Sequence, residues 1–267
     1  MVGAPFFLLS FPEGFSLMAS KKASWVSVLD SVAPHIPGVI SRILLYGPPG
    51  TGKSSWPFRK YGDARCMRET IDTSKLPSDL IGTWRLEASA GGTRTAWADG
   101  PAVAICRRAA ANPGETFCLV LDEVDQCSPE VRAFLHQLMD DRAIAGIPLP
   151  TGERVQVPAN LLIVGTSNSS PGELSEALLD RFDLALACVA PADGILASLP
   201  LGMRSALESH YAQSHGAGKW SWQVGVSARS MIRLNALTSA MGDLGAAADL
   251  LFGENGATVV NMVSESV

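Results

Sequence analysis

The stretch "LLYGPPGTGKSS", residues 44–55, decides which fold this sequence predicts. From Gly47 to Ser54 it fits the spacing G-x-x-x-x-G-K-[ST]. Glycines at this spacing let backbone N–H groups surround phosphate oxygens, while Lys53 would reach the β- and γ-phosphates and the Ser54 hydroxyl would ligate Mg²⁺. The apolar run before it, residues 39–46, is typical of a buried strand. We therefore expect a nucleotide phosphate to be bound by Gly47, Pro48, Pro49, Gly50, Thr51, Gly52, Lys53, Ser54 and Ser55.

The segment after the loop is less regular. A phosphate loop should lead into a helix whose N-terminus faces the anion. Residues 53–62, "KSSWPFRKYG", make an awkward helix because Pro57 falls in its first turn or just beyond it. A proline is tolerated there only where its missing N–H would be unpaired anyway. The motif indicates a nucleotide phosphate but does not say which reaction follows.

Composition indicates an ordinary globular protein, with 47% apolar and 18% charged residues. The 267 residues suffice for one α/β core and a smaller appended domain. A net charge of −5, with no basic run longer than "SKKAS", disfavours a nucleic-acid partner. Five spread cysteines without a C-x-x-C pair favour reduced thiols in a cytoplasmic chain over disulfides or a zinc site.

The first residues briefly resemble a signal sequence. They lack a basic start, and Pro12 and Glu13 interrupt the apolar run. The run is too short to cross a bilayer, so we expect no membrane span. We interpret residues 1–22 as an N-terminal extension, and the sequence leaves open whether translation begins at Met1 or Met18.

Four apolar strands alternate with helical segments along the chain. The strands are expected at 39–46, about 64–71, 117–121 and 161–166. This alternation predicts a parallel sheet covered by helices, the three-layer α/β/α sandwich. Two hairpins are also expected, one at Gly91-Gly92 and one turning at Thr151-Gly152. From about residue 193 the pattern becomes helical, with helices at 201–214, 227–241 and 243–252. We therefore predict an α/β domain over 23–190 and a small helical domain over 191–267.

Two further strand ends carry polar side chains. The apolar run 117–121 ends in Asp122 and Glu123, at the edge of the sheet where open α/β folds place ligands. Asp122 suits a Mg²⁺ ligand, and Glu123 suits a base for an attacking water. The strand 161–166 leads into Thr166, Ser167 and Asn168, which could orient that water or could simply form a turn.

Taken together and in order, "GPPGTGKS", "LVLDEVD", "LLIVGTSN" and "LLDRFD" resemble the AAA+ ATPases. The segments "SDLIGTW", "WADGPAVAICR" and "TGERVQVP" resemble the MoxR-like and dynein-related branch, in which the first hairpin is an insertion in the second helix. The resemblance is close over residues 38–190 and loose over 195–250. It implies the P-loop NTPase fold with a C-terminal helical lid, and the cofactors ATP and Mg²⁺.

The resemblance also implies roles for three residues beyond the loop. Asn168 matches the sensor-1 position, and Arg181 in "LLDRFD" matches the arginine finger that reaches the neighbouring subunit's γ-phosphate. Arg229 matches sensor 2 at the start of a lid helix, with Arg233 as a weaker candidate. A surface ion pair with a neighbouring aspartate is the alternative for Arg181. Trp84 and Trp97 could lie on pore-facing loops or pack as a cross-strand pair.

The function implied by the resemblance is ATP hydrolysis by a hexameric, ring-forming homo-oligomer that remodels or assembles a protein client. Members of this branch often act with a partner protein carrying a von Willebrand A domain. Two alternatives stay open at this point. One is an ATP-dependent switch with little turnover, favoured by the disturbed helix after Lys53. The other is a motor directed by nucleic acid, which the acidic net charge disfavours.

Overall fold

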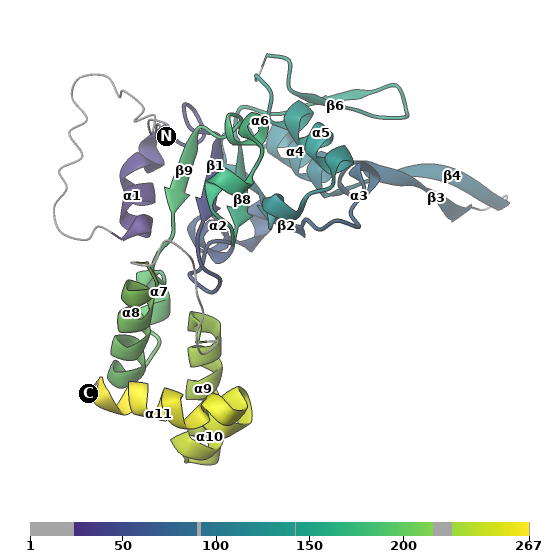
Figure 1. Ribbon diagram of the computed structural model, residues 1–267. Helices are drawn as coiled ribbons and strands as arrows, with labels where there is room; N and C mark the ends of the chain where they lie inside the picture. The colour runs from purple at the N-terminus through teal and green to yellow at the C-terminus, as the bar shows by residue number, and fades with distance from the viewer. Residues whose placement is uncertain (1–23, 90–91, 142, 216–225, 267) are drawn as a thin grey trace, which may run out of the picture.

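The computed structural model describes residues 24–89, 92–141, 143–215 and 226–266 (Figure 1). Its centre is a five-stranded, fully parallel sheet in the order β2-β5-β8-β1-β9. The strands are β1 (Arg42–Tyr46), β2 (Cys66–Thr70), β5 (Phe117–Asp122), β8 (Leu161–Ser167) and β9 (Leu184–Ala187). The predicted α/β fold with a parallel sheet is confirmed.

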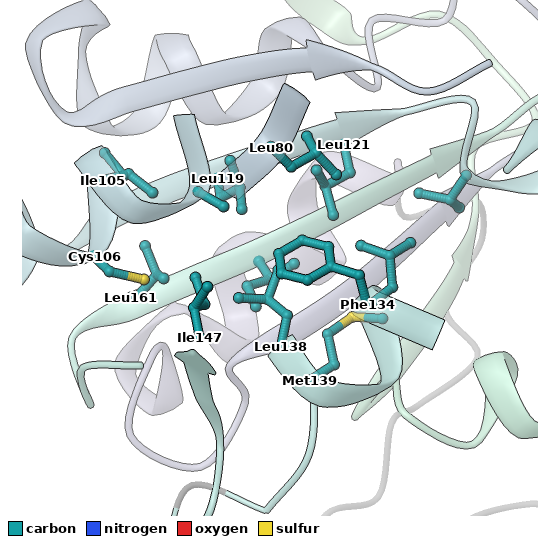
Figure 2. Close-up of a cluster of buried hydrophobic side chains, with 14 of the residues drawn as sticks. Leu80, Ile105, Cys106, Leu119, Leu121, Phe134, Leu138, Met139, Ile147 and Leu161 are labelled. Atoms are coloured by element: carbon teal, nitrogen blue, oxygen red, sulfur yellow. The ribbon is translucent and has the colours of Figure 1, made fainter. Parts of the chain in front are cut away.

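Helices cover both faces of the sheet, because parallel strands are joined by crossover connections that are usually helical. Every residue of β5 and β8 is buried, and alternate residues along a strand point to opposite faces. Leu119 and Leu121 pack with α3 (Pro77–Ile81), α4 (Pro101–Ala111) and α5 (Pro129–Leu138). Figure 2 shows this cluster, with Leu80 and Phe134 around the strand residues. Cys118 and Val120 face α1 (Trp25–Val32) and α2 (Ser55–Tyr61) on the other side.

Helix α2 forms despite the proline in its sequence. Pro57 is the third residue of the helix, a position whose backbone N–H has no partner within the helix. The sequence "GELSEALLDRFD", residues 172–183, predicts one helix. The structure has instead a short 3₁₀ turn at Pro171–Glu173 and the four-residue helix α6 (Glu176–Leu179).

Two hairpins extend from the sheet domain. The first pairs β3 (Gly82–Ser89) with β4 (Gly92–Asp99), and it projects far from the sheet (Figure 1). Trp84 lies opposite Trp97, and their rings meet edge to face with centroids 5.6 Å apart. Trp84 stays 49% exposed, so the pair packs across the strands without joining the core. The second hairpin pairs β6 (Gly146–Pro148) with β7 (Arg154–Gln156).

One arginine on α4 connects the two hairpins. Arg107 donates from Nε to Asp99 at the end of β4 at 2.8 Å. Its Nη1 and Nη2 donate to the two carboxylate oxygens of Glu153, beside β7, at 2.7 Å each. A guanidinium that binds a carboxylate through two parallel hydrogen bonds also fixes its direction. The two hairpins are therefore joined through α4.

The remaining helices build a separate core. They are α7 (Asp193–Leu196), α8 (Leu201–His215), α9 (Ala228–Met241), α10 (Leu244–Phe252) and α11 (Gly256–Glu265). Leu207, Met231 and Val259 are fully buried at its centre. In Figure 1 this group lies below the carboxyl end of the sheet. The sequence-based boundary near residue 190 remains a prediction, and the expected extension 1–22 lies outside the described residues.

Strand β9 and helix α11 are among the elements that the sequence did not predict. Strand β9 lies at the sheet edge and is only partly buried. Its sequence, "LALA", has four residues, which is too few to show a clear hydrophobic period. Helix α11 buries only Gly256, Val259 and Val263, spaced along one face, against α8 and α10. All five cysteines are free and buried. Within the described ranges, no helix has the length and apolar character needed to cross a bilayer.

Candidate nucleotide site

The loop after β1 has the backbone that its glycines predict. Gly47, Gly50 and Gly52 have φ angles of 137°, 83° and 94°, the region that favours glycine. A Cβ on Gly47 would also stand 2.7 Å from the Cys188 carbonyl oxygen at the end of β9. A loop built this way turns tightly and leaves its backbone N–H groups available to an anion.

Lys53 is the buried cation of the site, with only 6% of its surface exposed. Its Nζ donates to the carbonyl oxygens of Gly47 and Pro48 at 2.7 and 2.8 Å, and to Asn168 Oδ1 at 3.1 Å. Burial lowers the pKa of Lys53 to about 8, although nearby carboxylates, including Asp122, act in the opposite direction. All three ammonium donors thus have oxygen acceptors.

Asp122 ends β5 and is buried beside the loop. Its Oδ1 accepts a hydrogen bond from Thr166 Oγ1 at 2.8 Å. Its Oδ2 forms an ion pair with Arg68 of β2. Thr166 also accepts from the Glu123 backbone N–H at 3.3 Å, so one hydroxyl links the ends of β5 and β8. The sequence did not single out Arg68, because nothing local marks it as part of a site.

Glu123 has an unusual backbone. With φ 60° and ψ 45° it is the sole non-glycine residue of positive φ in the part of the chain that the structure describes. Such a conformation costs about 1 kcal/mol or more and persists where surrounding contacts hold it. Its Oε1 accepts from Asn168 Nδ2 at 3.3 Å. Asn168 therefore joins Lys53 to Glu123, and it is Ser167 whose hydroxyl makes the local turn contacts, with Ser169.

The first lid residues of α9 lie against the loop. A Cβ on Gly50 would stand 3.2 Å from the Ala228 backbone nitrogen. Tyr211 of α8 donates to the Pro49 carbonyl oxygen at 2.9 Å and accepts from Ala228 N–H at 3.5 Å. This contact between lid and loop was not predicted. It holds the N-terminus of α9, and with it Arg229, at the site.

A cavity of about 420 Å³ lies between the loop, the ends of β5 and β8, and α9. Most of the predicted residues line it: Pro49, Gly50, Gly52, Lys53, Ser54, Ser55, Asp122, Glu123, Asn168 and Arg229. Arg68, Thr166, Ile195, Ile232 and Arg233 complete the wall. Gly47, Pro48 and Thr51 lie behind it, where the Thr51 hydroxyl donates to the Pro48 carbonyl oxygen at 3.2 Å.

The oxygen atoms at this cavity fit a hard cation. Asp122 supplies a carboxylate, and the Ser54 hydroxyl makes no capping hydrogen bond to α2. Mg²⁺ in proteins is bound by one or two side-chain oxygens together with phosphates and water. Among the described residues there is no group of three or more His, Cys, Asp or Glu side chains that could hold a metal by themselves. The donor set suits a metal that arrives with a phosphate ligand.

Arg181 is not at this cavity. It lies after α6 and lines a second cavity of about 440 Å³, together with Arg42, Asp140 and Asp180. Its Nη1 is 3.7 Å from Asp180, and its buried Nε has no hydrogen-bond partner. The structure therefore separates Arg181 from the other predicted site residues within one subunit.

The aspartate two positions later holds this segment in place. Asp183 Oδ2 accepts from the Ser41 and Arg42 backbone N–H groups at 2.8 and 2.9 Å, and Oδ1 accepts from Arg42 Nη2 at 2.6 Å. Arg42 also donates to the Met139 carbonyl oxygen at 2.5 Å. The pKa of Asp183 is lowered: burial acts to raise it, but the hydrogen bonds from Arg42 and Ser41 outweigh that effect.

A phosphate-loop motif between a buried strand and a helix, on a parallel sheet with acids at the next strand end, defines the P-loop NTPase class. Residues 42–182, more than half of the chain, match the model of the AAA domain of the dynein-related subfamily. The chain belongs to this family, and the predicted resemblance is confirmed. The family indicates nucleotide binding and, in general, ATPase activity.

One curated relative extends the comparison. The chain is 31% identical over 171 residues to Protein NorQ of Paracoccus denitrificans (strain Pd 1222). The aligned region covers 62% of this chain and 52% of NorQ, so the chain spans about half the length of that relative. Together with the match to the dynein-related model, this likeness agrees with the MoxR-like and dynein-related branch expected from the motifs.

Proposed function

We propose that this protein hydrolyses ATP with Mg²⁺ at sites formed between the subunits of a hexameric ring. The observation that carries the proposal is the chain of contacts from Lys53 through Asn168 to Glu123 inside one cavity, with Arg181 outside it. A site with its base in one place and its finger-like arginine on another surface needs a second copy to be complete. Family members are usually oligomeric, which supports this arrangement.

Each residue then has a task in the reaction. The loop N–H groups and the Lys53 ammonium bind the phosphates, while Ser54 and Asp122 hold Mg²⁺, which would neutralise charge on the β- and γ-oxygens. Asn168 orients the attacking water, and a Glu123 carboxylate oxygen accepts the proton of that water as it attacks the γ-phosphorus. Arg229 contacts the nucleotide from the lid. Arg181 of the adjoining copy stabilises the charge that develops on the γ-phosphate.

We also propose how the free energy of ATP hydrolysis is used. A change in lid angle, passed through α9, would move the hairpins against a protein client. The client, a von Willebrand A-domain partner and a cytoplasmic location are supported by likeness to the MoxR-like branch. A switch with little turnover is the second candidate, but α2 is intact, so the feature that favoured it is gone.

The first test is ATP turnover per molecule as protein concentration rises, with Mg²⁺ and no partner protein. The proposal expects specific activity to climb, because sites form only on assembly. A flat but substantial rate would contradict a site between subunits. A flat rate near zero would instead favour the switch.

Mixing two inactive variants tests the shared site directly. Glu123→Gln retains its arginine and Arg181→Ala retains its base, so a mixed ring should contain some complete sites and regain activity. A mixture of Glu123→Gln with Lys53→Ala, both defective on the same side of the site, is the matched control and should stay inactive. No recovery in the first mixture would place Arg181 outside the reaction.

A further inference from the structure

Arg68 is an unassigned cation at the nucleotide cavity. It lies in the middle of β2 and lines the cavity wall. Its Nε and Nη2 both contact Oδ2 of Asp122, the last residue of the neighbouring strand β5. The Arg68 side chain is 50% exposed, whereas that of Asp122 is 4% exposed. A half-exposed cation is therefore paired with a buried anion.

The surroundings of Asp122 explain why it needs a cation. A buried carboxylate is costly unless it is paired and hydrogen-bonded. Thr166 satisfies Oδ1 but carries no charge. Lys53, the nearest buried cation, directs its three donors to Gly47, Pro48 and Asn168. Within the described part of the chain, the ion pair that Asp122 makes is the one with Arg68.

The same oxygen is the one that a metal would use. Oδ1 already accepts the Thr166 hydroxyl, which also accepts from Glu123 N–H and so is fixed between two strands. Among the described residues, the hydrogen bonds and ion pair at Oδ2 come from Arg68, which also lines the cavity. A guanidinium and a divalent cation at one oxygen would repel each other at close range. They are therefore alternative partners for Asp122.

We propose that Arg68 competes with Mg²⁺ for Asp122 and thereby sets the Mg²⁺ concentration at which the protein holds a nucleotide. Binding of the metal with its nucleotide releases Arg68 toward the cavity and solvent, which costs little because half of the side chain is already exposed. This inference rests on the proposed role of Asp122 as the metal ligand. It assigns to β2 a function in metal dependence that the motif residues do not supply.

The test measures binding and not turnover. A fluorescent ADP analogue at fixed concentration is titrated with Mg²⁺ against wild-type protein and Arg68→Gln. Removing the competitor should lower the Mg²⁺ concentration for half-maximal binding, by about two- to fivefold for a half-exposed pair. Arg68→Lys, which keeps the charge but loses the two-pronged contact, should fall between the two. An unchanged or higher Mg²⁺ requirement in Arg68→Gln overturns the proposal.

Two controls separate this result from other effects. Arg94 lies on the β3–β4 hairpin, does not line the cavity, and pairs with Glu87 at 2.9 Å. Arg94→Gln should therefore show the same Mg²⁺ requirement as wild type. Asp122→Asn should lose most of the metal dependence. If Asp122→Asn behaves like wild type, the proposed function of Asp122 fails. If only Arg68→Gln behaves like wild type, the competition alone fails. Should Arg68→Gln not fold, Arg68→Lys carries the same comparison.

Discussion

Asn168 Nδ2 lies 3.3 Å from Glu123 Oε1 and donates a hydrogen bond to it, across the ends of two neighbouring strands. The amide oxygen of the same side chain accepts from Lys53. A single neutral residue thus spaces the buried ammonium from the candidate base. A charge at this position would pair with one of them and disturb the other, which is a reason for an amide to be there.

Replacing Glu123 with glutamine should abolish turnover but preserve ATP binding. Glutamine keeps an oxygen that can accept from Asn168, but it cannot accept the proton of a water, and loss of a general base typically costs about a hundredfold or more. Single-turnover hydrolysis and equilibrium binding measure the two effects. Glu130→Gln, on the exposed first turn of α5, is the control. Full turnover in Glu123→Gln would remove Glu123 from the mechanism.

Asn168→Ala should slow turnover by about tenfold or more, because the water loses an orienting group and Glu123 loses its donor. Steady-state rates at saturating ATP measure this effect. Ser170→Ala, two residues further along at an exposed position, should leave the rate unchanged. If Asn168→Ala turned over ATP as fast as Ser170→Ala, Asn168 would have no role in hydrolysis and would only be part of the turn that Ser167 forms with Ser169.

Nucleotide affinity should fall as the pH rises above 8. Burial lowers the pKa of Lys53 to about 8, so the free protein loses the ammonium at higher pH and must regain a proton to bind phosphate. Affinity should decline by up to about tenfold per pH unit. Lys53→Arg stays charged and should give a flat profile from pH 8 to 9.5. A flat wild-type profile would contradict the role of the ammonium.

Asp183→Asn should destabilise the protein by about 1–3 kcal/mol at pH 7, because it weakens the hydrogen bonds from Arg42. The folded pKa of Asp183 is depressed, so this stabilisation is present above the unfolded pKa. It is lost as the pH falls through the lower folded pKa. The difference between variant and wild type should therefore shrink below about pH 4. Urea unfolding at several pH values measures it, and a difference independent of pH would contradict the ion pair.

Tyr211→Phe should loosen the lid from the phosphate loop. It leaves the Pro49 carbonyl and the Ala228 N–H without their buried partner, which typically costs about 1–3 kcal/mol. We expect lower unfolding stability together with weaker nucleotide binding. Ser239→Ala, at an exposed hydroxyl on the far part of α9, is the control. Lower stability with unchanged binding would limit Tyr211 to a structural role.

Local patterns predicted the fold and most of the cavity wall. The phosphate loop, the acids after β5 and the polar end of β8 are each marked by a few consecutive residues, and parallel strands bring their carboxyl ends to one edge. Arg68 and Tyr211 carry no such mark. Their partners lie 54 and 162 residues away, so strand pairing and lid packing create these contacts.

The size of an element also limits what sequence can predict. Strand β9 has four residues at the sheet edge, too few for a period to be recognised. The separation of Arg181 from the cavity is likewise a product of tertiary structure, since the motif around it looks the same for either location. Its role across a subunit boundary stays a prediction.

The Arg107 contacts have a mechanical consequence. Exposed ion pairs add little to stability, so the link from Asp99 to Glu153 is not there mainly to keep the chain folded. Arg107 gives the two hairpins a shared point of attachment on α4. A shift of β4 or β7 relative to α4 would therefore change the contacts that Arg107 makes with the other hairpin.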